Sequence, residues 1–136
     1  MPLEQKIMTE QEILSNRDPS LRTLAMPADA NPNGDIFGGW LLGQMDIAGA
    51  NYAYRIADGR ITTVAIEAMS FHLPVYIGDE VSCYCKTKRI CTTSIAVDIE
   101  TWVRRRRGPK IEKVTEGIYI YVAIDDSGKP RKVLKD

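Results

Sequence analysis

The stretch FGGWLLGQMDIAGANYAYRIAD, residues 37–58, constrains the fold more than any other part of this sequence. Nearly all of its residues are apolar or small, over a length that suits one continuous helix. We expect the helix to end near Asp58 and Gly59, where a glycine suits a C-terminal cap. A helix this apolar must be covered on most of its surface, so the rest of the chain has to wrap around it.

The segments after residue 60 have the composition of strands. In 93–103 apolar and polar residues alternate, which is typical of a half-buried strand, and short connections between the last segments predict antiparallel hairpins. Strands are predicted at 21–26, 61–71, 81–91, 93–103 and 111–125. We therefore expect an α+β domain in which a curved antiparallel sheet of about five strands covers one long central helix.

One domain is expected at residues 21–125, because 136 residues suffice for a single core and the sequence has no internal repeat. Residues 1–20 are polar and predict an N-terminal arm, and residues 126–136 form a charged C-terminal tail. The first twenty residues are too polar for a signal peptide, and no apolar run is long enough to span a membrane.

The charge balance excludes some partners. Eighteen basic residues offset eighteen acidic ones, so nucleic acid and an anionic membrane surface are not expected partners. The three cysteines, Cys83, Cys85 and Cys91, form no CxxC pair and accompany a single histidine, so they predict neither a metal site nor a disulfide framework. We expect a reduced, cytoplasmic protein.

One residue of the helix does not fit a simple core role. At about 100° per residue, Gln44, Asn51, Arg55 and Asp58 form a narrow polar stripe, while Asp46 lies about 150° away from it. Burying an unpaired carboxylate costs several kcal/mol. Asp46 therefore either has a structural partner, such as a basic side chain or backbone amides at a subunit contact, or lines a cleft and acts as a base or nucleophile.

The loop before the helix carries a second candidate group. Residues 27–35, PADANPNGD, predict a surface loop that ends in Asp35, and Gly38 and Gly39 follow. In one interpretation, Asp35 caps the helix and the two glycines serve only packing. In the other, the glycines let a ligand approach the unpaired amides of the first helical turn, which suit a developing oxyanion. Asp35 and Asp46 lie roughly 16 Å apart along one helix, so both can act at one site only if another subunit supplies one of them.

Two motifs carry a family resemblance. The segments LRTLAMPADANPNGDIFGGWLLGQMDIAGA and TVAIEAMSFHLPVYIGDEV closely resemble the YciA-like acyl-CoA thioesterases of the hotdog-fold superfamily, over about residues 20–125. The resemblance implies a helix wrapped by an antiparallel sheet, dimers with a continuous sheet, and commonly hexamers built from three dimers. It also implies hydrolysis of fatty acyl-CoA to fatty acid and CoA.

The resemblance assigns roles to the candidate residues. Asp46 matches the family's catalytic aspartate, as general base or nucleophile, and Asp35 would complete the site from the opposite subunit. Gly38 and Gly39 would polarise the thioester carbonyl with their amides. No metal or organic cofactor is implied, since coenzyme A is part of the substrate and product.

The coenzyme A nucleotide is expected at the turn near KRICTTSI. The family often carries an arginine before paired serines there, whereas this chain has Thr92, Thr93 and Ser94, so Lys88 or Arg89 would supply the cation.

Other features fit structural roles. His72, the only histidine, is expected in a loop, and the lack of a helix-region histidine disfavours a hotdog dehydratase. Glu67 is expected to pair with a basic residue, and RRRR at 104–107 to form a solvated hairpin tip. The alternative to a thioesterase is a non-catalytic acyl-CoA-binding or sensor module on the same scaffold.

Overall fold

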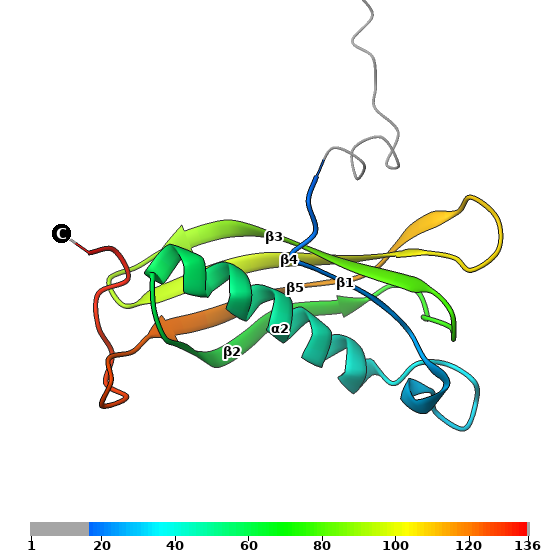
Figure 1. Ribbon diagram of the computed structural model, residues 1–136, viewed down its shortest axis with the longest axis horizontal. Helices are drawn as coiled ribbons and strands as arrows, with labels where there is room; N and C mark the ends of the chain where they lie inside the picture. The colour runs from blue at the N-terminus through cyan, green and yellow to red at the C-terminus, as the bar shows by residue number, and fades with distance from the viewer. Residues whose placement is uncertain (1–16, 136) are drawn as a thin grey trace, which may run out of the picture.

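A five-stranded antiparallel sheet carries one long helix across one of its faces (Figure 1). The computed structural model describes residues 17–135, so the predicted arm lies outside the described residues as far as residue 16. The elements are β1 (Leu21–Leu24), η1 (Pro27–Asp29), α2 (Gly38–Ala57), β2 (Ile61–Phe71), β3 (Glu80–Ile90), β4 (Ser94–Arg104) and β5 (Ile111–Ala123). The predicted α+β fold class, with one helix and five strands, is confirmed. In the described part of the chain no helix combines the length and hydrophobicity that a membrane span needs.

Local backbone conformation sets the two ends of α2. Phe37 precedes the helix in an extended conformation, with φ −58° and ψ 135°, and Asp58 ends it in the left-handed region, with φ 49° and ψ 51°. The amide of Gly59 then donates to the carbonyl of Tyr54, which satisfies one of the last helical carbonyls. The predicted helix, 37–58, therefore consists of α2 and its two cap residues.

The strand order is β1-β3-β4-β5-β2. Strands β3, β4 and β5 follow each other as hairpins. Strand β2 pairs with the other side of β5, so this eleven-residue strand forms one edge of the sheet. This pairing places Thr63 of β2 directly across from Tyr121 of β5. Two residues distant in sequence thus meet under the helix.

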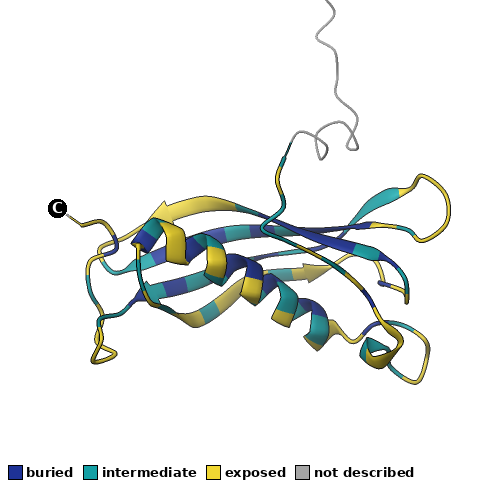
Figure 2. Cartoon of the chain, in the orientation of Figure 1, coloured by how far each residue is buried: buried dark blue, intermediate teal, exposed yellow. Residues whose placement is uncertain are grey.

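The core lies between α2 and the sheet, and the helix is buried along that side only (Figure 2). Small residues of α2 let the helix lie close to the strands, because they leave little side-chain volume between the two layers. These are Ala48, Gly49, Ala53 and Ala57, all buried. The sheet contributes Ile95, Val97 and Ile99 from β4 and Tyr119 and Tyr121 from β5.

The charged tail packs on the domain as far as the structure describes it. Val133 is 1% exposed and belongs to the main core, and its amide donates to the carbonyl of Thr92. The guanidinium of Arg131 donates to the carbonyl of Ala57 at 2.8 Å. The tail therefore joins the C-terminal end of α2 to the β3–β4 turn.

Val133 is the one buried side chain among the described residues of the tail, and shortening it should measurably destabilise the protein. Val133→Ala is expected to lower the free energy of unfolding by about 2 kcal/mol, because it removes two buried methyl groups and leaves a cavity. Urea denaturation measures the change. The matched control is Leu134→Ala, since Leu134 is 59% exposed and its truncation should cost less than about 0.5 kcal/mol. Equal effects of the two substitutions would show that the tail is not part of the cooperative core.

Candidate active site

The helix presents Asp46 on a side different from its polar stripe. Asn51, Arg55 and Asp58 are exposed, whereas Asp46 is half-buried beside β2 and β5. The Asp46 Oδ1 atom accepts a hydrogen bond from Thr63 Oγ1 at 2.7 Å and one from Tyr121 Oη at 3.1 Å. The orientation matches the one expected from helical geometry.

The contacts of Asp46 within one chain bear on the structural explanations that the sequence leaves open. Within residues 17–135 Asp46 forms no ion pair, and its Oδ2 atom accepts no hydrogen bond. The carboxylate is thus held by two hydroxyl groups through one oxygen, and the other oxygen is left open. Such a group can bind a proton or attack an electrophile.

Sequence reasoning missed both hydroxyl partners of Asp46. Thr63 and Tyr121 lie 17 and 75 residues further along the chain. The signal in the sequence was the alternation in GIYIYVA, which places Tyr119 and Tyr121 on one face of β5. Burial, together with the negative charge of Asp46, raises the pKa of the Tyr121 phenol well above its usual range. This phenol therefore stays protonated and acts as a donor.

The loop before α2 is organised by Asn31. Its Oδ1 atom accepts hydrogen bonds from the amides of Asn33 and Asp35, at 2.9 and 3.2 Å, and its own amide donates to the carbonyl of Asp35 at 2.6 Å. The possible capping role of Asp35 is wrong, because Phe37 occupies the cap position without a side-chain hydrogen bond. The half-buried Asp35 carboxylate makes no hydrogen bond or ion pair with the described residues.

The first turn of α2 leaves two glycine amides open. The amides of Trp40 and Leu41 donate to the carbonyl of Phe37, whereas those of Gly38 and Gly39 find no acceptor in the described part of the chain. Both glycines are exposed, and a Cβ atom on Gly39 would meet nothing within 4 Å. Packing within one protomer thus gives no reason for a glycine at position 39.

The predicted catalytic residues do not meet within one chain. Gly39 and Asp46 are seven residues apart on the same helix, which corresponds to about 10 Å along its axis, and Asp35 lies further away before the helix begins. One protomer therefore keeps the predicted site residues in two separate groups, one at the start of α2 and one around Asp46, here called the two partial sites.

The residues predicted to bind the nucleotide lie at the opposite end of the helix from Gly38. Lys88 and Arg89 are exposed near the end of β3, and the turn that follows them is tied to the C-terminal tail and to β5 by backbone hydrogen bonds. In that turn Thr92 is also exposed and Thr93 is half-buried, and Ser94 begins β4 half-buried. These five residues are close in the fold but lie away from Asp35.

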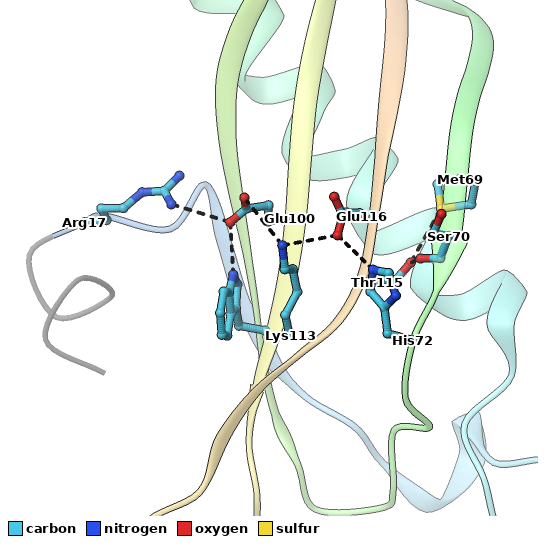
Figure 3. Close-up of polar contacts among 9 residues, drawn as sticks. Arg17, Met69, Ser70, His72, Glu100, Lys113, Thr115 and Glu116 are labelled. Carbon is cyan, nitrogen blue, oxygen red and sulfur yellow. Dashed lines mark hydrogen bonds and ion pairs between the residues drawn. The ribbon is translucent and has the colours of Figure 1, made fainter. Parts of the chain in front are cut away.

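The remaining polar candidates do not contact Asp46. His72 follows β2, and its Nε2 atom lies 2.8 Å from Glu116 Oε2. This pair continues through Lys113 and Glu100 to Arg17, across the face of the sheet opposite α2 (Figure 3). Hydrogen bonds from His72 and Lys113 lower the pKa of Glu116.

Two expectations about charged residues are wrong. Glu67 is exposed and forms no ion pair within residues 17–135, because its side chain lies on the solvent side of the edge strand. The arginine run is not a uniformly solvated tip. Arg105 is only 15% exposed and pairs with Asp79 at 2.6 Å and with Glu112 at 2.8 Å.

Comparisons with known proteins point to one family. Residues 33–109 match the thioesterase superfamily. The acyl-CoA thioester hydrolase YciA of Salmonella typhimurium is 55% identical over 114 residues, which cover 82% of this chain and 86% of the relative.

Two solved structures share the fold. The hexameric thioesterase y2039 of Yersinia pestis is 50% identical with a TM-score of 0.84, covering 89% of this chain and 98% of that chain. The hexameric hotdog-fold thioesterase Cj0915 of Campylobacter jejuni is 37% identical with a TM-score of 0.83, covering 87% and 91%. The chain therefore belongs to the hotdog-fold thioesterase superfamily and, within it, to the YciA-like acyl-CoA thioester hydrolases.

Proposed function

We propose that this protein hydrolyses fatty acyl-CoA thioesters to free fatty acid and coenzyme A. The observation that carries the proposal is the Asp46 carboxylate, half-buried without an ion pair in the described chain and held through one oxygen only. Family membership supplies the substrate class, since the YciA relatives are named acyl-CoA thioester hydrolases. No metal or organic cofactor takes part, and coenzyme A enters as part of the substrate.

Two chemical routes use the open oxygen of Asp46. In the first, the carboxylate takes a proton from water while that water attacks the thioester carbonyl carbon. In the second, the carboxylate attacks the carbon itself and forms an anhydride, which water then hydrolyses. In both routes the carbon–sulfur bond breaks and coenzyme A leaves as a thiolate that takes up a proton. The amides of Gly38 and Gly39 suit the developing oxyanion, because neither donates to an acceptor within residues 17–135.

The two partial sites meet only if two chains combine. We infer a homodimer in which the start of α2 and Asp35 from one subunit complete the site around Asp46 of the other. The uncovered side of α2 and the edge strand β2 expose apolar side chains that a second copy would bury. These are Ile47 at 58%, Tyr54 at 53%, Val64 at 55% and Ile66 at 44% exposure. Three such dimers would form a hexamer, the assembly named for the Yersinia and Campylobacter relatives.

A charge on the edge strand should separate the subunits and abolish turnover together. Val64→Lys is expected to convert the dimer to a monomer, because a lysine on an edge strand disfavours pairing with another strand. Activity should fall with dimer content, since each monomer has only partial sites. Sedimentation velocity and thiol release measure the two effects on the same sample.

The matched control is the same change on the other edge of the sheet. Leu24 of β1 is 53% exposed, close to the 55% of Val64, so Leu24→Lys should keep the β2-mediated dimer and its activity. A monomeric but fully active Val64→Lys protein would contradict a shared site.

The coenzyme A nucleotide is assigned to the β3–β4 turn. The cations of Lys88 and Arg89 would contact the phosphates, and the hydroxyl groups of Thr92, Thr93 and Ser94 would accept and donate hydrogen bonds beside them. The compartment we propose is the cytoplasm, because the three cysteines form no disulfide.

Release of free thiol from acyl-CoAs of graded chain length, followed with a chromogenic reagent, tests the proposal. We expect enzyme-dependent release that saturates with substrate. Saturable binding of acyl-CoA by calorimetry without release above the buffer rate would instead establish a non-catalytic binding module.

A further inference from the structure

Two buried tyrosines of β5 attach the sheet to the helical turn that carries Asp46. Tyr119 donates its hydroxyl to the carbonyl of Leu42 at 2.8 Å, and Tyr121 Oη lies 3.1 Å from the carbonyl oxygen of Asp46. Both side chains are fully buried, and their rings stack with centroids 6.4 Å apart. The backbone turn from 42 to 46 is thereby fixed at both ends.

Only one of these tyrosines also contacts the carboxylate. Tyr121 Oη lies 3.1 Å from Asp46 Oδ1, the same oxygen that accepts the hydroxyl of Thr63. Because a phenol has a single proton, the carbonyl oxygen and the Oδ1 atom of Asp46 share that proton. The buried phenol stays protonated, as its raised pKa indicates, so it is a permanent donor toward Asp46.

The helix is built to admit this phenol. Gly49 lies one turn after Asp46, and a Cβ atom there would overlap the Tyr121 hydroxyl and approach Ile99 Cδ1 to 2.7 Å. Any larger residue at this position would push the ring or the helix away. The glycine thus keeps the phenol within hydrogen-bonding distance of the turn.

We propose that Tyr121 is a positioning residue for thioester hydrolysis: its hydroxyl holds Oδ1 of Asp46 so that Oδ2 faces the reacting atoms. The inference rests on the proposed function and names a residue outside the set that the family resemblance implied. Tyr121 itself does not touch substrate, since it is covered by α2.

The test compares Tyr121→Phe with Tyr119→Phe. Each change removes one hydroxyl from a buried ring and one bond from sheet to helix, but only Tyr121→Phe removes a donor to the carboxylate. We expect Tyr121→Phe to lower kcat by roughly 10- to 100-fold with KM within about twofold. The acidic limb of its pH–rate profile should move to higher pH, because a carboxylate that loses a donor is less stable when ionised. Tyr119→Phe should change neither kcat nor the position of the acidic limb of the pH–rate profile.

A second measurement does not depend on turnover. Carbon-13 NMR of the aspartate carboxyl groups, with the Asp46 signal assigned from Asp46→Asn, reports the titration of Asp46 directly. We expect its midpoint to rise in Tyr121→Phe and to stay at the wild-type value in Tyr119→Phe. Identical titrations and identical kcat in the two variants would overturn the proposal. A wild-type protein without thioesterase activity would overturn the proposed function instead, and the NMR comparison would still decide whether Tyr121 holds the carboxylate.

Discussion

Replacing Asp46 with asparagine is expected to lower kcat for acyl-CoA hydrolysis by about 10²- to 10⁴-fold. The amide of asparagine has nearly the shape of the carboxylate and can still accept the hydroxyl of Thr63 at Oδ1. It has no negative charge, however, so it neither accepts a proton from water nor attacks a carbonyl carbon. The change therefore removes the chemistry and keeps the packing. Initial rates of thiol release, with active protein quantified by acyl-CoA binding, measure the loss.

The control for Asp46→Asn is the same substitution at the end of the same helix. Asp58 is exposed, and its carboxylate pairs only with Lys135, at 3.4 Å, within the described residues. Asparagine also tolerates the left-handed conformation of this position. Asp58→Asn should therefore keep both the rate and the unfolding midpoint. Wild-type activity in Asp46→Asn would remove the basis of the proposed function.

The position of Asp46 could be predicted because it depends on local geometry. Helical periodicity fixes the direction of every side chain of α2 once a few polar residues mark the solvent side. The same reasoning placed Asn51 and Arg55 in water, where the structure has them. Local rules also gave the strand segments to within a few residues.

The contacts of Asp46 could not be predicted because they depend on sheet register. The alternation in 111–125 separates isoleucines from tyrosines but does not say which set faces the helix. The structure buries Tyr119 and Tyr121 completely and leaves Ile118 and Ile120 half-exposed, against the order that hydrophobicity alone suggests. The tyrosines face inward because carbonyls of α2 accept their hydroxyls.

The proposal of a second chain could be made from the sequence, but the surface that would bind it could not be predicted. The separation of Asp46 from the start of α2, and from Asp35 before it, is independent of how the sheet folds. The edge position of β2, in contrast, depends on how the sheet folds, because β2 pairs with β5 although β3 and β4 lie between them in the sequence. Which apolar residues remain uncovered is therefore a property of the folded chain.

Removing the carboxylate of Asp79 is expected to cost about 3–5 kcal/mol of unfolding free energy. Asp79 is 2% exposed and accepts hydrogen bonds from Arg105 at 2.6 Å and from the amide of Tyr76 at 2.9 Å. Burial alone would lower the pKa of Arg105, but the carboxylates of Glu112 and Asp79 outweigh it and raise that pKa. Asp79→Ala leaves the buried guanidinium with one carboxylate fewer and the Tyr76 amide without its acceptor. Urea denaturation at fixed protein concentration measures the loss.

The neighbouring residue provides the control for Asp79→Ala. Glu80 also pairs with arginines, Arg22 at 3.7 Å and Arg104 at 3.6 Å, but its side chain is 35% exposed and these pairs are solvated. Glu80→Ala should therefore cost less than about 1 kcal/mol, because water replaces the lost partner. Asp79 and Glu80 both pair with arginine and differ in burial, so comparing the two substitutions shows whether burial or pairing determines the loss of stability. A small effect at Asp79, no larger than that at Glu80, would show that the 74–79 turn rearranges to hydrate Arg105.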